Sequence, residues 1–365
     1  MRVLHFFKTA FPDSMGGIEQ IINQIAEGTT RLGVNNTVLS LSKVQNRQVD
    51  ELNGYRSCRA PQDFEIASTG FSTSAISWFF KLSKEVDIIH YHFPWPFMDI
   101  AHFTARVKVP TVVTYHSDVV NQKKLLKLYQ PLQYAFLNDV TRIIATSPNY
   151  KNSSPVLSRF SHKTETIPLG ISPVLTSQDH IDKWARRFPF HFFLFVGVLR
   201  YYKGLNTLLD AARGAKYPIV IVGDGPECRA LKEKAQNLNL GNVYFLGKVS
   251  QPDKGALLSL CYAMVFPSHL RSEAFGVSLL EAAQYSKPMI TCEIGTGTSY
   301  VNIGMETGLV IEPESAFRLK EAMDFLWENP EESIRMGKNA AARYKNLFTS
   351  EGMVNSYFDL YSRLI

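Results

Sequence analysis

Short apolar runs typical of β-strands alternate with segments of helical periodicity along the whole chain. The clearest helical segment is 18–31, where Ile18, Ile21, Ile22 and Ile25 recur at the spacing of one helix face. The strand-like runs lie at residues 3–7, 37–41, 86–90, 111–115 and 142–146, and again at 192–198, 219–223, 243–247, 264–267 and 288–291. This alternation predicts parallel sheets built from right-handed βαβ units.

The chain is long enough to form two domains. Its 365 residues exceed one ordinary core, and 45% hydrophobic with 20% charged residues is typical of a globular protein. We therefore predict an α/β protein with two doubly wound parallel-sheet domains, 1–172 and 173–348, rather than one barrel. A polar, proline-bearing linker is expected within 171–190. The last helix, in 349–365, carries apolar and aromatic residues that must pack, and the first domain is one place for it.

Composition excludes several classes of protein. The longest uncharged apolar run, 192–199, is far shorter than the roughly 20 residues that span a bilayer, and no secretory signal is expected at the N-terminus. The net charge of +6 comes without a nucleic-acid motif, so anionic lipids or phosphorylated substrates are the expected partners. Four cysteines without metal spacing predict free thiols, buried at Cys261 and Cys292, in a reducing compartment such as the cytoplasm.

Candidate site residues cluster where strands end, which is where doubly wound sheets bind ligands. After strand 264–267 the chain places Glu273, Gly276 and Glu281 around the start of a predicted helix. Free amides at a helix start bind phosphate, and carboxylates accept hydrogen bonds from sugar hydroxyls. Taken alone, the two glutamates are better explained as a cap and a surface helix residue.

Other strand ends carry polar residues as well. Gly16 and Gly17 precede a helix and would either admit a phosphate or form a plain turn. His90 and His116 end two strands of the first domain, and an ordinary hydrogen bond to backbone explains His90 better than His116. A His-x-His pattern can bind metal, but suitably spaced carboxylates and cysteines are scarce, so we expect none. In the second domain, the cations that could neutralise a leaving diphosphate are Arg200 and Lys203, beside glycine-rich strand ends at Gly197 and Gly223.

The ordered set of motifs resembles the retaining GT-B glycosyltransferases of family four over nearly the whole chain. The matching residues are Gly16-Gly17 with Glu19, His116, Lys203-Gly204, Gly223-Asp224-Gly225, and the pair Glu273 and Glu281. Segments 4–20 and 199–204 are more narrowly similar to bacterial mannosyltransferases of O-antigen and lipopolysaccharide assembly. The resemblance implies two Rossmann-like domains that face a central cleft.

The resemblance also implies roles for individual residues. Glu273 would contact the transferred sugar, Glu281 the ribose, and His116 the donor sugar near the reacting carbon, while Lys203 binds the diphosphate. Further donor-binding positions would be Gly16, Gly17, Gly223, Gly247, Lys248, Phe275, Gly276, Val277 and Ser278.

One position departs from the family pattern. Family members usually carry arginine directly after the glycine that matches Gly197, whereas this chain has Val198. Arg200, two residues later, is expected to supply the guanidinium from a shifted position.

The expected activity is retaining transfer of an α-mannosyl group from GDP-mannose to a lipid-linked saccharide, without metal or cofactor. Alternatives are another donor such as a UDP-sugar, a phosphorylase or epimerase of the same architecture, and a non-catalytic protein that binds sugar nucleotides. The basic, apolar stretch 121–129, with 78–81, could rest on the inner membrane surface. The alternative is an ordinary helix with one face in the core.

Overall fold

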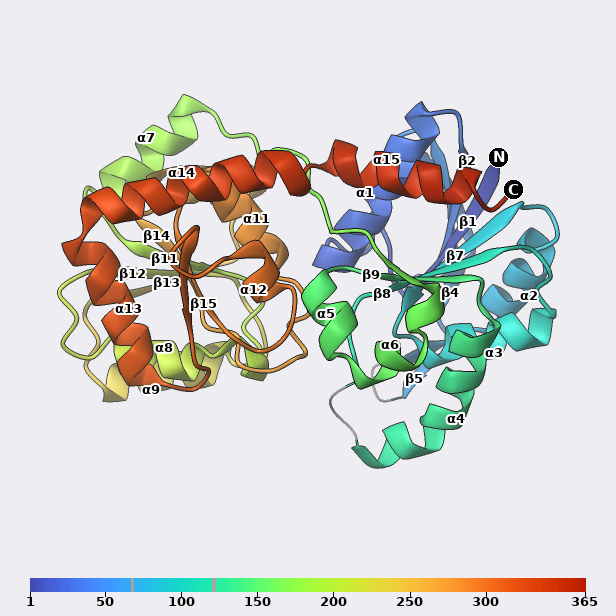
Figure 1. The fold of residues 1–365 in the computed structure, drawn as a ribbon, viewed down its shortest axis with the longest axis horizontal. Coiled ribbons are helices and arrows are strands. Elements are labelled where there is room, and N and C mark those ends of the chain that lie inside the picture. The colour runs from blue at the N-terminus through green and yellow to red at the C-terminus, as the bar shows by residue number, and fades with distance from the viewer. Residues whose placement is uncertain (67–68, 120–122) are drawn as a thin grey trace. The chain divides into compact units, whose positions relative to one another are not determined.

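The computed structural model describes residues 1–66, 69–119 and 123–365, without the side chains of 123 and 124. It divides the chain into two compact units, one formed by Met1–Gly170 with Thr349–Ile365 and the other by Ile171–Phe348 (Figure 1). The predicted domain boundary, after residue 172, lies close to this division. Helix α15 (Ser350–Ser362) belongs to the first unit.

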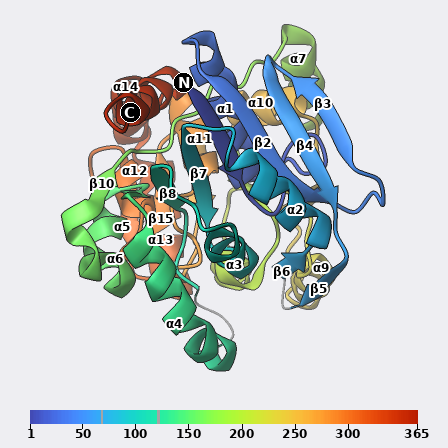
Figure 2. The same cartoon turned by 90° about the vertical axis from the view of Figure 1, so that its right-hand side faces the viewer.

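The first unit contains an eight-stranded sheet in the order β10-β9-β8-β7-β1-β2-β4-β3. Its strand pairs are parallel except for the antiparallel β3–β4 pair at one edge (Figure 2). The strands are β1 (Arg2–Phe6), β2 (Asn35–Ser42), β3 (Gln48–Leu52), β4 (Tyr55–Pro61), β7 (Ile88–Phe93), β8 (Thr111–Tyr115), β9 (Arg142–Ala145) and β10 (Thr164–Thr166), and the short hairpin β5 (Phe64–Ile66) with β6 (Thr69–Phe71) lies apart.

Apolar helix faces cover this sheet. Helix α1 (Gly17–Arg31) buries Ile21, Ile22 and Ile25, the periodic residues expected to face the core. Helix α15 packs on α1 so closely that a Cβ on Gly28 would lie 2.4 Å from a methyl carbon of Val354. The other helices are α2 (Thr73–Leu82), α3 (Pro96–Ala105), α4 (Lys123–Asp139), α5 (Pro148–Ser153), α6 (Pro155–Arg159) and the 3₁₀ turn η1 (Ser161–Lys163).

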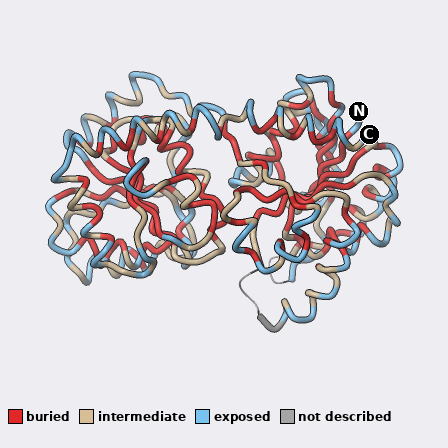
Figure 3. Tube along the Cα trace, in the orientation of Figure 1, coloured by how far each residue is buried: buried red, intermediate tan, exposed pale blue. Residues whose placement is uncertain are grey.

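The second unit contains a fully parallel six-stranded sheet in the order β13-β12-β11-β14-β15-β16. Its strands are β11 (Phe193–Val196), β12 (Ile219–Val222), β13 (Val243–Gly247), β14 (Ala263–Phe266), β15 (Met289–Cys292) and β16 (Gly308–Ile311). The strand order reverses between β11 and β14, where ligands bind in sheets of this kind. In both units buried residues gather in the interior (Figure 3) and include the central strands, whereas the edge strands β3 and β13 are more exposed.

Helices connect these strands in sequence. They are α7 (Gln178–Arg187), the 3₁₀ turn η2 (Tyr201–Lys203), α8 (Leu205–Ala211), α9 (Cys228–Asn237), α10 (Gln251–Leu260), α11 (Val277–Gln284), α12 (Thr298–Val301), α13 (Ala316–Glu328) and α14 (Pro330–Leu347). The α/β prediction of two doubly wound sheets is confirmed.

The sequence prediction missed helix α7 and several strands, namely β3, β4, β10, β16 and the hairpin β5–β6. The proposed linker 171–190 contains helix α7, which is held on α10 because Trp184 is buried and its indole N–H donates to Asp253 over 2.8 Å. Strand β4 was missed because its buried residues include Arg59, whose guanidinium pairs with Asp13 and Asp50 instead of water. A strand that buries a paired arginine has no continuous apolar run to detect.

Two further expectations concern membranes and thiols. Among the described helices, none combines the length and apolar character that a membrane crossing requires. The cysteines are free, and Cys261 and Cys292 are buried as predicted, together with Cys58.

Candidate active site

A buried ion pair lies at the carboxyl ends of β11 and β14, beside the point where the strand order reverses. The ammonium of Lys203, at the end of η2, pairs with Oε2 of Glu273 in the loop after β14. The two residues are 9% and 8% exposed, and the hydroxyl of Ser268 donates to the same carboxylate oxygen over 3.1 Å. The structure thus brings together two residues that the sequence analysis placed in the site.

The pair leaves one carboxylate oxygen available. The hydrogen bonds from Lys203 and Ser268 both go to Oε2 of Glu273. Among the described residues of the second unit, none donates a hydrogen bond to Oε1. The Lys203 ammonium lies 4.6 Å from the ring centroid of Phe266, an apolar neighbour that excludes water. A fixed carboxylate with a free oxygen can accept a hydrogen bond from a substrate hydroxyl.

Glycines allow the strand ends to approach one another. Gly204 follows Lys203 with φ +69°, and a Cβ there would lie 1.9 Å from the carbonyl oxygen of Pro267 at the end of β14. Gly223 has φ +134°, and its Cβ would lie 1.9 Å from the carbonyl oxygen of Gly197. Its amide donates to the carbonyl of Gly247 over 2.8 Å, which joins the ends of β12 and β13. Lys203 and the strand end at Gly223 are therefore positioned by close backbone contacts of Gly204 and Gly223 that a side chain would prevent.

Helix α11 begins inside the predicted loop. Gly276 precedes it with φ +87°, and the helix starts at Val277, so the amides of Phe275 to Ser278 lie at or beside its N-terminus. Glu281 on this helix is 3% exposed and accepts a hydrogen bond of 2.6 Å from the ammonium of Lys254. The interpretation of Glu281 as a surface residue and of Glu273 as a helix cap is therefore wrong.

Lys254 was missed by the sequence analysis. It lies on α10, far from Glu281 in the sequence, and no local motif marks it. Only the tertiary structure, which brings these two side chains together, identifies this partner.

Arg200 and Lys248 are less constrained than Lys203. Both are exposed, and among the described residues neither side chain has a recorded ion pair or hydrogen bond. Val198 is 50% exposed, and the backbone amide of Arg200 donates to its carbonyl over 2.9 Å. Substitution of Arg200 for the arginine missing at Val198 stays a prediction.

In the first unit, Gly16 caps helix α1 and Gly17 is its first residue. Glu19 accepts hydrogen bonds from the hydroxyls of Thr9 and Ser14, over 2.7 and 2.8 Å. A Cβ on Gly16 would lie 2.4 Å from Oε2 of Glu19, so a side chain there would displace this carboxylate. Both glycines are exposed, which leaves their backbone accessible to a ligand.

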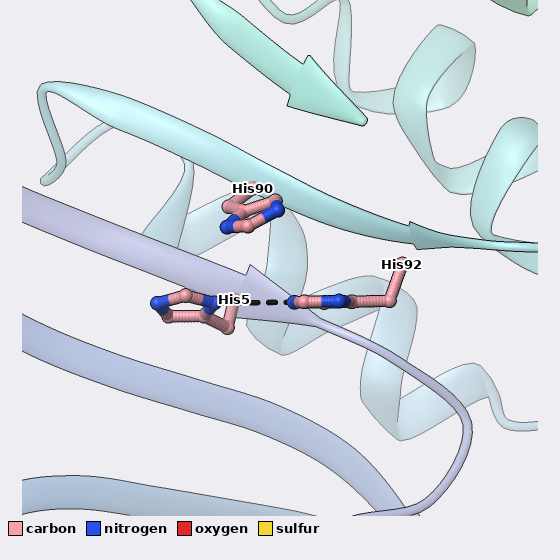
Figure 4. A group of neighbouring side chains, drawn as sticks. All are labelled: His5, His90 and His92. Atoms are coloured by element: carbon pink, nitrogen blue, oxygen red, sulfur yellow. Dashed lines mark hydrogen bonds between the residues drawn. The ribbon is translucent and has the colours of Figure 1, made fainter. Parts of the chain in front are cut away.

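His116 follows β8 and is buried beside three other histidines. Its Nε2 lies 3.1 Å from Nδ1 of His92, and burial lowers its pKa to about 3. Nitrogen atoms of His5, His90 and His92 lie within 4.8 Å of one another, a spacing that could hold a metal ion (Figure 4). Burial also lowers the pKa of all three, so they are uncharged at neutral pH.

The nitrogens of His90 already have partners. Its Nδ1 lies 2.6 Å from the hydroxyl of Tyr361 and its Nε2 lies 2.7 Å from that of Thr114. The expectation that His90 bonds to backbone was therefore wrong, because side chains of α15 and β8 take both nitrogens.

Comparison with known proteins gives matches over both halves of the chain. A family described as Glycosyltransferase Family 4 matches residues 15–174, and one described as Glycosyl transferases group 1 matches residues 177–343. The chain is 52% identical to the D-rhamnosyltransferase WbpZ of Pseudomonas aeruginosa, over 96% of this chain and 93% of that protein. It is 47% identical to the O-antigen chain mannosyltransferase C of Escherichia coli, over 100% and 99%.

A solved structure supports the fold. The sucrose-phosphate synthase of Thermosynechococcus elongatus matches with a TM-score of 0.83 and 21% identity, over 100% of this chain and 98% of that one. At this identity the likeness concerns the fold alone.

The buried ion pair makes a testable contribution to stability. Lys203→Met should lower the free energy of unfolding by about 3 kcal/mol, because it leaves a buried carboxylate without its partner. The double variant Lys203→Met/Glu273→Gln should recover part of that loss in chemical denaturation. As a matched control, the half-exposed pair Lys320 and Asp324 should show a coupling of about 0.5 kcal/mol or less. Additive effects at Lys203 and Glu273 would contradict the pairing.

Proposed function

Since the chain belongs to the family 4 glycosyltransferases, enzymes of the GT-B fold, we propose that it transfers a mannosyl group from GDP-mannose to a lipid-linked saccharide of the O-antigen. The observation that carries this proposal is the 47% identity, over essentially both full lengths, to an O-antigen chain mannosyltransferase. The buried Lys203–Glu273 pair gives the proposal a chemical centre.

A second donor is favoured by a specific observation. The 52% identity to a D-rhamnosyltransferase supports transfer of D-rhamnose, which is mannose without its 6-hydroxyl group. The two sugars share the configuration of their other hydroxyls, so one site could accept either. The alternative to both GDP-linked sugars is a UDP-sugar donor.

The proposed roles are those that the family resemblance implies, and the contacts in the site support them. Lys203, Arg200 and the amides at the start of α11 stabilise the departing diphosphate, and this mechanism uses no metal or cofactor. The free oxygen of Glu273 accepts a hydrogen bond from a hydroxyl of the transferred sugar. Glu281 accepts hydrogen bonds from the ribose hydroxyls. Lys254 holds one carboxylate oxygen of Glu281 in place while the second carboxylate oxygen binds the ligand.

The proposed reaction retains the configuration at the sugar carbon. The bond from that carbon to the phosphate oxygen breaks, and a bond to the acceptor oxygen forms on the same face. The proton of the acceptor hydroxyl passes to the leaving phosphate. No side chain forms a covalent intermediate, so the cationic groups around the diphosphate carry most of the stabilisation.

Binding of the donor nucleotide can be measured by thermal unfolding. We expect GDP to raise Tm more than UDP or ADP at equal concentration, because stabilisation grows with occupancy of the folded state. Product formation with GDP-mannose and with GDP-D-rhamnose then separates the two candidate sugars. A larger shift with UDP would overturn the choice of nucleotide.

The two glutamates should differ in kinetics. Glu273→Gln should lower kcat about a hundredfold with little change in KM for the donor, because its contact strengthens as charge develops. Glu281→Gln should raise the donor KM about tenfold, because the loss of one hydrogen bond to a charged group weakens binding by about that factor. Equal losses of kcat with unchanged donor affinity would contradict these roles. Glu227→Gln, at a partly exposed residue in the turn before α9, is the control.

We also propose that α3 and α4 contact the membrane that carries the acceptor. The predicted stretch 121–129 falls partly outside the described residues, but Leu125 and Leu128 on α4 are 50% and 80% exposed. Ile100 and Phe103 on α3, which packs against α4, are each 40% exposed. In the other predicted segment, 78–81, Phe79 is fully buried and belongs to the core.

Vesicle sedimentation tests this contact. The variant Leu125→Ser/Leu128→Ser should bind vesicles containing phosphatidylglycerol about tenfold more weakly than the unchanged protein. Leu175→Ser, at a leucine that is 79% exposed in the second unit, should leave binding unchanged. Equal binding by all three proteins would remove α4 from the membrane contact.

A further inference from the structure

Four buried polar side chains form one continuous row across the sheet of the first unit. They are Asn36 in β2, His5 in β1, His92 in β7 and His116 directly after β8, and these four strands are neighbours in the sheet. The links are His5 Nε2 to Asn36 Oδ1 at 3.3 Å, His5 Nδ1 to His92 Nε2 at 3.2 Å, and His92 Nδ1 to His116 Nε2 at 3.1 Å. Figure 4 shows the central link between His5 and His92.

Strand register produces this row. His5 pairs with Val38, two residues beyond Asn36, and also with His90, two residues before His92. His92 in turn pairs with Thr114, two residues before His116. Each step therefore moves two residues toward the carboxyl end, which keeps all four side chains on one face of the sheet. The row ends at the strand ends where ligands bind.

The orientation of the Asn36 amide is set by its surroundings. Its Nδ2 lies 3.0 Å from the carbonyl oxygen of Ala26, which can only accept a hydrogen bond. The nearby hydroxyls of Thr29 and Thr30 donate to the carbonyls of Ile25 and Ala26, so they too present lone pairs to Nδ2. The nitrogen must therefore face this cluster, and the amide oxygen must face His5.

The amide oxygen sets the proton positions along the row. Because Oδ1 of Asn36 only accepts, His5 carries its proton on Nε2 and leaves Nδ1 as an acceptor. His92 must then donate from Nε2 and accept at Nδ1. His116 must donate from Nε2, which leaves its own Nδ1 without a proton. This sequence holds because each ring is uncharged, as its burial ensures.

The last nitrogen in the row is available to a ligand. Among the described residues of the first unit, none has a hydrogen bond to Nδ1 of His116. The ring is held in place at Nε2, and the residue is 4% exposed. A fixed, uncharged nitrogen lone pair at a strand end accepts a hydrogen bond from a hydroxyl group and not from a phosphate oxygen.

We propose that Asn36, His5 and His92 are positioning residues that hold His116 in the Nε2–H tautomer, so that its bare Nδ1 accepts a hydrogen bond from a sugar hydroxyl. The inference rests on the proposed glycosyltransferase function for the identity of the ligand. The tautomer itself follows from the protein alone and is measurable without substrate.

Nitrogen NMR on ¹⁵N-histidine-labelled full-length protein tests the tautomer directly. The signals of His116 are assigned as those that are missing from the spectrum of His116→Gln. They should show a protonated Nε2 and an unprotonated Nδ1 at neutral pH. Asn36→Leu removes the acceptor that begins the row, and should give His116 a mixture of both tautomers. The matched control is His102→Gln, which alters a buried histidine that bonds to Tyr91 and Asp139 instead of the row, and it should leave the His116 spectrum unchanged.

Kinetics provides the second readout. Asn36→Leu should lower kcat/KM for the sugar donor about fivefold, the size of one hydrogen bond, although Asn36 lies three links from His116. Affinity for the free nucleotide, which lacks the sugar, should not change. His102→Gln should keep kcat/KM within about twofold of the unchanged protein, since its hydrogen-bond partners Tyr91 and Asp139 lie outside the row.

The outcomes separate the two proposals. A protonated Nδ1 or a charged imidazole on His116 in the unchanged protein would overturn the inference even if Asn36→Leu fails to fold. An unchanged tautomer and unchanged kcat/KM in Asn36→Leu would overturn it as well. If no sugar nucleotide is turned over but the tautomer is as stated, the assigned function fails and the proton arrangement stands.

Discussion

The ion pair between Lys203 and Glu273 constrains the second unit more than any other contact in its site. Each charge is desolvated, so neither can remain there without the other. The loops after β11 and β14 must therefore meet, and Gly204 permits this because a side chain there would overlap the Pro267 carbonyl. The same arrangement leaves one carboxylate oxygen free at the point where the strand order reverses.

The first unit handles buried polarity in another way. The hydrogen-bond partners described for His5, His90, His92 and His116 include no carboxylate. Burial keeps these rings uncharged, and hydrogen bonds to one another, to Asn36 and to hydroxyls replace the lost water. The second unit thus contains buried charged side chains, whereas the first unit contains an uncharged imidazole that can accept a hydrogen bond.

Sequence patterns predicted the parts of the structure that local spacing determines. The apolar runs predicted ten strands close to their observed positions. Lys203 was identified by its place at a strand end, but Glu273 and Glu281 only by the resemblance of the ordered motifs, because spacing alone favoured a cap and a surface residue for the two glutamates. Lys254 and Asn36 were not identified, because their partners are distant in sequence and depend on how helices pack and strands align. Helix α7 was missed because its polar face dominates its composition and only Trp184 is buried.

The path of the chain has a consequence for folding during synthesis. The first unit begins at Met1 but is completed only by Thr349–Ile365, after the whole second unit has been made. Until then His90 and Thr114 lack the hydroxyls of Tyr361 and Tyr357, and α1 lacks the helix that covers Gly28. Domains generally fold in the order in which they leave the ribosome. Here the second unit can fold first, because the first unit is incomplete until Thr349–Ile365 has been made.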